Sequence, residues 1–211
     1  MSHMAHVRKT LEILRQHHLY AKVSKCSFFQ SSVEYLGHVV SDKGLSPVPA
    51  KVQAVSNWKV PTNVSEIRSF LGLAGYYHRF IPDFAETVAP LANLTRKHTP
   101  FTWFLREGEA FRALKTALQT APFLLLADPT RPYIVTTDAS EFAMGAVLSQ
   151  VWEDGEHPVA YESRKMNAAE QNYPTHKREL LAGIHVLRTW RHYLLGKKFT
   201  IVSDHHSLKY L

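Results

Sequence analysis

Two acidic residues stand where predicted buried strands end, and this feature constrains the fold more than any other. Residues 133–137 (YIVTT) are followed at once by Asp138, and residues 199–203 (FTIVS) are followed by Asp204. Between them, residues 175–195 have the spacing of a long helix. Since a strand–helix–strand crossover joins parallel strands, we expect both acids to lie side by side at one edge of a sheet.

A third acid, Glu179, falls in the first turns of that predicted helix. Its neighbours one and two turns further on are small, which allows the helix to lie close to the sheet and bring Glu179 inward: Ala182, Gly183 and Val186. Larger residues form an adjacent stripe that we expect to pack in the core: Leu180, Ile184 and Leu187.

Three carboxylates at one place repel one another unless cations lie between them. Oxygen ligands favour Mg²⁺ first and Mn²⁺ second, so a site for one or two of these ions is predicted. The alternative for each acid alone is a local role: Asp138 and Asp204 can cap the turns that follow them, and Glu179 can complement the helix dipole. Capping does not predict that the three acids converge.

The first half of the chain predicts short helices and a hairpin. Residues 26–40 hold two β-rich runs separated by Gln30-Ser31-Ser32, which suggests a hairpin, and helices are expected at residues 51–58 and 108–120. Asn63, followed three residues later by Glu66, is a capping pair that opens another helix.

Charge is unevenly distributed along the chain. Residues 1–100 carry 12 Lys and Arg against 6 Asp and Glu, a net charge of +6, whereas residues 101–211 carry 13 against 12, a net charge of +1. A basic first half suggests a polyanion such as nucleic acid, although a basic protein without such a partner is the alternative. The one cysteine, Cys26, excludes an internal disulfide and fits an intracellular location, and no apolar run is long enough to predict a membrane span.

Five stretches closely resemble the reverse transcriptase polyprotein of gypsy-type LTR retrotransposons. They follow that family's order over nearly the whole chain: YLGHVVSDKGL, FLGLAGYYHRFIPDFA, TDASEFAMGAVLSQ, VAYESRKMNAAEQNYPTHKREL and WRHYLLGKKFTIVSDHHSLKYL. The resemblance implies that residues 1–43 are the end of the palm, with 33–40 similar to the hairpin that grips the primer strand. Residues 44–100 resemble the thumb, and residues 101–211 an incomplete RNase H-like domain.

The implied fold class is α+β or α/β: a small β-hairpin and a helical thumb, then a mixed sheet with a crossover helix, truncated at its C-terminus. The resemblance implies Mg²⁺-dependent hydrolysis of RNA in an RNA–DNA hybrid, with Mn²⁺ as a substitute ion. The family's catalytic and metal-binding acids fall on Asp138, Glu179 and Asp204. The implied partners are such a hybrid or a template–primer duplex and the rest of the polyprotein, within a cytoplasmic particle or the nucleus.

Four residues of the thumb-like region are candidates for nucleic-acid binding: Arg68, Gly72, Tyr76 and Arg79. Arginines neutralise phosphates and a glycine allows a helix to approach a groove. For Tyr76 the alternative is packing in the thumb core, which we consider the more frequent role of such a tyrosine.

The departures from the family pattern limit the expected activity. The polymerase signature Tyr-x-Asp-Asp is absent, and the fourth acid of the RNase H domain would follow residue 211. We therefore expect weak or no nuclease activity, and the alternative function is an inactive nucleic-acid-binding remnant of a degraded retroelement. A transposase or integrase is disfavoured because Glu179 lies between the two aspartates instead of after them.

Overall fold

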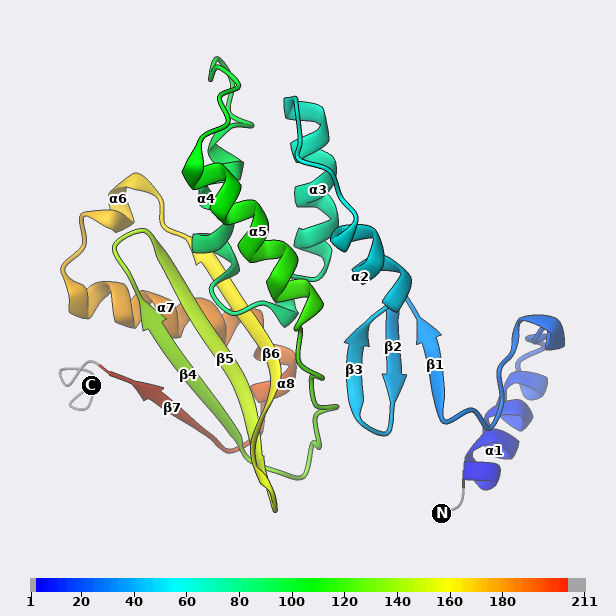
Figure 1. Cartoon of the computed structure of the whole chain (residues 1–211). Helices are drawn as coiled ribbons and strands as arrows, with labels where there is room; N and C mark the ends of the chain where they lie inside the picture. Colours follow the sequence, from blue (N-terminus) through cyan, green and yellow to red (C-terminus); the bar gives the residue numbers. More distant parts are fainter. Residues whose placement is uncertain (1–2, 205–211) are drawn as a thin grey trace.

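The computed structural model describes residues 3–204 (Figure 1). The N-terminal part contains α1 (His3–Gln16), the 3₁₀ turn η1 (Val23–Lys25), β1 (Ser32–Tyr35), β2 (His38–Ser41) and β3 (Gly44–Pro47). The helical region contains α2 (Pro49–Ser56), α3 (Val64–Tyr76), η2 (His78–Phe80), α4 (Phe84–Asn93) and α5 (Leu105–Gln119). The C-terminal part contains β4 (Tyr133–Ala139), β5 (Ala143–Trp152), β6 (Gly155–Lys165), α6 (Ala168–Gln171), α7 (Thr175–Thr189), α8 (Arg191–Leu194) and β7 (Phe199–Ser203).

The predicted hairpin exists, but its turn lies elsewhere. Residues 26–31 are not in a strand, and β1 pairs with β2 around Leu36 and Gly37. Both turn residues have positive φ, 45° and 68°, which suits the right-handed twist of a two-residue hairpin and favours glycine at the second position. Gly37, and not the polar Gln30-Ser31-Ser32 segment, marks the turn in the sequence.

The four helices α2 to α5 share one hydrophobic core. Fully buried members of this core come from each of them and include Val55, Phe70, Leu91 and Leu114. The predicted capping pair of α3 is confirmed, because Glu66 N donates to Asn63 Oδ1 at 2.9 Å and Asn63 Nδ2 donates back to Glu66 Oε1 at 2.8 Å. The domain boundary at residue 101 stays a prediction, and α5 beyond it packs with the helices before it.

The two ends of this helical region are tied together. Leu45 on β3 and Leu124 after α5 exchange both backbone hydrogen bonds, at 2.7 and 2.8 Å. The contact requires a glycine at residue 44, where φ is 115° and a Cβ atom would stand 2.3 Å from the Leu124 carbonyl oxygen. The chain therefore leaves β3, forms four helices and returns to the same point.

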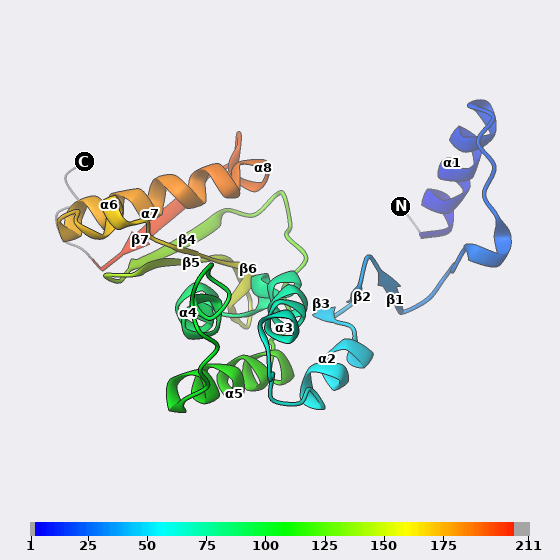
Figure 2. The same ribbon diagram turned by 90° about the horizontal axis from the view of Figure 1, so that it is seen from above.

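The C-terminal part is a mixed sheet with strand order β6-β5-β4-β7. The strands β6, β5 and β4 are antiparallel neighbours, and β7 pairs with β4 in parallel through the crossover helix α7. Helix α7 covers one face of this sheet, and the helices α4 and α5 lie on the other side (Figure 2). The chain thus has the mixed α and β class expected from its sequence.

The crossover helix is shorter than predicted. Helix α7 ends at Thr189, and α8 forms a separate turn before Gly196, which has a φ of 72°. Trp190 breaks the helix because its backbone leaves the helical region (φ −96°, ψ 17°) while its side chain is buried against the sheet. Within residues 3–204, no helix is both long and apolar enough to cross a membrane.

Glu162 on the edge strand β6 joins the helical region to the sheet domain. Its Oε2 lies 3.7 Å from His78 Nε2 of η2, and its Oε1 lies 3.2 Å from His185 Nε2 of α7. Burial raises the pKa of Glu162, but the hydrogen bonds from His185 and His78 outweigh it and lower the pKa to about 2. The hydrogen bond to Glu162 raises the pKa of His78, against burial and the nearby Arg79 charge.

We predict that the stabilising effect of this contact depends on pH. The contribution of Glu162 is present above pH 4.5 and is lost as the pH falls toward 2, because its folded pKa is the lower one. The contribution of His78 is present below pH 6.5 and is lost as the pH rises through its raised pKa. Glu162→Gln should therefore lower the free energy of unfolding most at pH 5–6, by on the order of 1 kcal/mol.

Urea unfolding at several pH values measures this difference. Glu153→Gln is the matched control, because it removes a carboxylate of the same charge from an exposed position in the β5–β6 turn. An equal loss for Glu162→Gln at pH 5.5 and pH 9 would contradict the prediction.

Candidate metal centre and nucleic-acid residues

Asp138 and Asp204 lie at the carboxyl ends of two neighbouring parallel strands. Asp138 is the sixth residue of β4, and Asp204 follows β7 directly. Thr137 on β4 is the register partner of Ser203 on β7, so the two acids come one residue later on adjacent strands. Both side chains are exposed, and parallel pairing alone accounts for their proximity.

Glu179 reaches the same point from the crossover helix. It is only 3% exposed, and its Oε1 accepts the Ala139 backbone N–H at 3.2 Å. Its Oε2 accepts the Ser203 hydroxyl at 3.5 Å. Glu179 is therefore held between the ends of β4 and β7, and its orientation is fixed by groups on both strands.

The small residues of α7 explain how the helix comes close enough. Ala182 and Val186 are buried against the sheet, as expected, but a Cβ on Gly183 would have no atom within 4 Å, so the small size of Gly183 is not what lets the helix approach. Leu180 and Ile184, which we expected in the core, are instead 42% and 39% exposed. Helix α7 packs on the strands through its stripe of smaller residues, because a stripe of larger residues would hold Glu179 too far from Ala139.

The three carboxylates form one group. Each offers an oxygen atom, and these atoms all lie within 4.8 Å of one another. Carboxylate oxygens spaced in this way fit a hard divalent cation, and without a cation the arrangement is electrostatically unfavourable. The acidic group could therefore hold a divalent metal ion.

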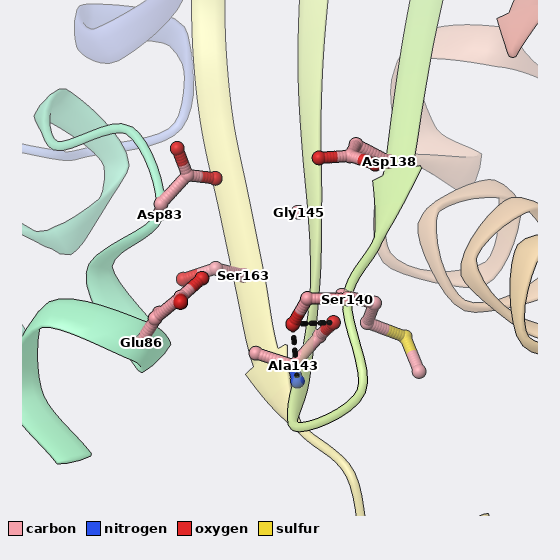
Figure 3. Close-up of a pocket in the computed structure, with 8 residues that line it drawn as sticks. Asp83, Glu86, Asp138, Ser140, Ala143, Gly145 and Ser163 are labelled. Carbon is pink, nitrogen blue, oxygen red and sulfur yellow. Dashed lines mark hydrogen bonds between the residues drawn. The ribbon is translucent and has the colours of Figure 1, made fainter. Parts of the chain in front are cut away.

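A small polar hollow of about 20 Å³, large enough for about one water molecule, lies beside Asp138 (Figure 3). Asp83 and Glu86, at the start of α4, line it opposite Asp138. Asp83 Oδ1 lies 2.7 Å from the place where a Cβ atom on Gly145 would stand, so a larger residue at position 145 would displace the Asp83 carboxylate. No local pattern in the sequence predicts a role for these two acids, because only the docking of α4 on the sheet brings them here.

Helix α4 packs on the row of three paired residues that crosses β4, β5 and β6 at Asp138, Gly145 and Ser163. Gly145 pairs with Asp138 on one side and with Ser163 on the other. Ser163 Oγ accepts the backbone N–H of Ala85, the second residue of α4, at 2.8 Å. The start of α4 therefore sits on the row of residues that ends at the metal centre.

The candidate nucleic-acid residues lie in three different settings. Arg68 is exposed on α3, with its Nη2 donating to the Thr95 carbonyl at 3.2 Å, and Gly72 is exposed with open space above it. Arg79 instead points to the sheet, where its Nη2 lies 3.5 Å from the Val159 carbonyl. Its buried Nε has no hydrogen-bond partner within the part of the chain that the structure describes.

Tyr76 and its neighbour Tyr77 contact the hairpin turn. The Tyr76 hydroxyl donates to the Leu36 carbonyl, and the Tyr77 hydroxyl donates to the Gly37 carbonyl at 2.7 Å. Tyr76 also stacks on His38, with ring centroids 5.3 Å apart, and keeps 49% of its surface exposed. The pair joins α3 to the turn of the hairpin, and the nucleic-acid role of Tyr76 stays a prediction.

Comparison with known proteins shows which protein family the C-terminal half of the chain is similar to. Residues 103–201 match the family model "RNase H-like domain found in reverse transcriptase". The retrovirus-related Pol polyprotein from transposon 297 of Drosophila melanogaster is 40% identical over 210 residues, 99% of this chain and 20% of that polyprotein. Residues 103–201 are thus an RNase H-like domain of the reverse transcriptase type, and the relatives of the chain are retrotransposon polyproteins. The Tf2-3 transposon polyprotein of Schizosaccharomyces pombe is 38% identical over 98% of this chain and 16% of its own length. The chain thus spans a fifth or less of these curated relatives.

Solved structures agree with the fold of this chain. The foamy viral protease-reverse transcriptase in complex with RNA/DNA hybrid has a TM-score of 0.81 at 22% identity, covering 96% of this chain and 28% of that one. The same viral enzyme in complex with dsDNA has a TM-score of 0.80 at 22% identity, covering 98% and 44%. The hairpin, the helical region and the mixed sheet therefore recur together in a reverse transcriptase.

We predict that a divalent cation stabilises this chain through the three acids. Mg²⁺ should raise the melting temperature of the wild type above its value in EDTA, because the ion relieves carboxylate repulsion and binds only the folded site. Asp138→Asn should abolish most of this rise without lowering the melting temperature in EDTA. Glu141→Gln, an exposed acid in the loop between β4 and β5, is the matched control and should keep the full rise. Differential scanning fluorimetry and titration calorimetry measure both effects, and a full Mg²⁺ response in Asp138→Asn would exclude the three-acid site.

Proposed function

We propose that the sheet end of this chain hydrolyses the RNA strand of an RNA–DNA hybrid, using Mg²⁺, with Mn²⁺ as a substitute. The observation that carries the proposal is the convergence of Asp138, Glu179 and Asp204 within 4.8 Å at the ends of two parallel strands and one helix. The match of residues 103–201 to the RNase H-like domain of reverse transcriptases supports the same chemistry.

The three acids would have different tasks. Asp138 and Asp204 are exposed, so they can hold ions that also contact a substrate phosphate. Glu179 is buried and fixed by the Ala139 N–H, so it would set where an ion sits relative to the strand ends. When bound, a pair of such ions supplies an activated water and stabilises the leaving oxygen in phosphodiester cleavage.

The substrate would lie along the thumb-like helices and across the acids. A related fold, the foamy viral enzyme, has been solved with an RNA/DNA hybrid and with dsDNA, which supports a duplex partner for this chain. The exposed Arg68 and Gly72 on α3 can approach a phosphate backbone. We further propose that the remainder of a retroelement polyprotein is a partner and that the location is intracellular, in a cytoplasmic particle or the nucleus.

A second candidate function is nucleic-acid binding without hydrolysis. Two of the three acids are exposed, and Asp83 and Glu86 add negative charge beside Asp138. A substrate phosphate then reaches the site only when cations compensate this charge. We therefore expect slow cleavage from this chain alone.

Cleavage of an end-labelled RNA–DNA hybrid under single-turnover conditions tests the proposal. We expect slow RNA cleavage in Mg²⁺ or Mn²⁺ that Asp138→Asn removes, since one ligand to the ion is lost. Glu141→Gln serves again as the control. Hybrid binding without any cleavage by the wild type would favour the binding remnant, and cleavage that persists in Asp138→Asn would exclude the assigned acids.

We also predict a steep loss of hybrid affinity with salt, because phosphate contacts release counterions. Arg68→Ala should weaken binding and reduce the slope of log K against log salt by about 1. Arg15→Ala, which removes the same charge on α1, should leave the slope unchanged. Fluorescence anisotropy at several salt concentrations measures the slopes, and a flat response of the wild type would exclude backbone binding by the basic first half.

A further inference from the structure

A groove of about 490 Å³ lies between the end of α2 and helix α5. These two helices lie on the side of the helical region that faces away from the sheet (Figure 2), so the groove is separate from the metal centre. Its walls include two tryptophans, Trp58 and Trp103, and two cations, Arg112 and Lys115. No Asp or Glu is among the described residues that line it.

Two N–H donors converge above Gly108 in this groove. A Cβ atom on Gly108 would stand 3.6 Å from Arg112 Nη1 and 3.7 Å from Trp103 Nε1. Neither donor has a hydrogen-bond partner among residues 3–204. The absence of a side chain on Gly108 leaves space between the two donors, and the oxygens of one phosphate group can reach both from there.

The second cation is held in place beside this point. Lys115 Nζ donates to the Trp58 carbonyl at 3.0 Å and lies 5.2 Å from the centre of the Phe111 ring. Its position is therefore fixed before any ligand binds. Together with Arg112 it gives the groove a positive potential.

The two indoles are pre-arranged as well. Trp58 packs edge-on against Phe70 with ring centroids 5.7 Å apart, and Trp103 packs edge-on against Phe111 at 5.8 Å. Both remain partly exposed where they line the groove. Proteins that bind single-stranded nucleic acid without sequence preference combine rigid aromatic side chains with fixed cations. The bases stack on the aromatic rings, and the cations neutralise the phosphates.

We propose that this groove binds single-stranded nucleic acid, with one phosphate between Arg112 and Trp103 above Gly108 and a base against an indole. An acidic peptide would match the two cations but would leave the tryptophan surfaces without a stacking partner. The chain's net charge of +7 favours a polyanion. This site lies outside the proposed hydrolytic centre and does not depend on it.

Gly108→Ala is the sharpest test, because the new methyl group fills the phosphate position at ordinary contact distances. Alanine also favours the helix, so the variant should fold with an unchanged or higher melting temperature. We expect its Kd for a fluorescein-labelled oligothymidylate to rise about tenfold, as for the loss of one charged hydrogen bond. Gly183→Ala, in the interior of α7 with no atom within 4 Å of its new Cβ, is the matched control and should bind normally.

Trp103→Phe supplies a second test, because it keeps the ring and removes only the N–H donor. It should weaken oligothymidylate binding while leaving hybrid cleavage and hybrid affinity unchanged. Wild-type affinity in both Gly108→Ala and Trp103→Phe would overturn the proposal. So would displacement of the oligonucleotide by polyglutamate at equal charge concentration, since the groove would then be a general anion site. If the chain does not cleave the hybrid while the oligothymidylate results are as expected, only the proposed hydrolysis is contradicted.

Discussion

The parallel pairing of β4 with β7 is the constraint on which the rest of the candidate site depends. It sets the ends of the two strands beside each other, and the crossover helix that makes it possible has to lie across both. Glu179 then falls between the strand ends and accepts the Ala139 N–H, which closes the carboxylate group. A buried glutamate without such a donor would be costly, so this hydrogen bond also makes the position tolerable for a charged residue.

The site is also shaped by a surface that belongs to another part of the chain. The start of α4 rests on Gly145 and Ser163, and it brings Asp83 to the edge of the metal centre. At the neighbouring residue of β6, Glu162 connects His78 of the helical region with His185 of α7. The helical region is thus held along the edge strand β6, at Ser163 in the row that leads to Asp138 and at Glu162 beside it. The metal centre and the thumb-like helices are parts of one packed unit.

Much of the site could be predicted because it follows from local signals. Asp138 and Asp204 follow β-rich runs, and the small stripe of α7 indicated which way Glu179 points. What could not be predicted depends on contacts between distant segments. Asp83 lies 62 positions before Gly145, and no local pattern links them. Leu180 and Ile184 have the spacing of core residues but are exposed, because approach to the sheet is decided by the smallest stripe and not by the most apolar one. The position of the hairpin turn could not be predicted because Leu36 adopts a φ of 45°, which leucine disfavours, and only Gly37 marks the turn in the sequence.

The backbone bridge between Leu45 and Leu124 has a consequence for how this architecture tolerates change. Everything between these residues, all four helices included, forms a closed loop whose entry and exit coincide. The helices inside the loop also contact both sides of it, through Tyr77 on the hairpin turn and through Ala85 on Ser163 of the sheet. A connection without such a contact, such as residues 94–104 between α4 and α5, can therefore change in length while the bridge keeps the spacing from hairpin to sheet.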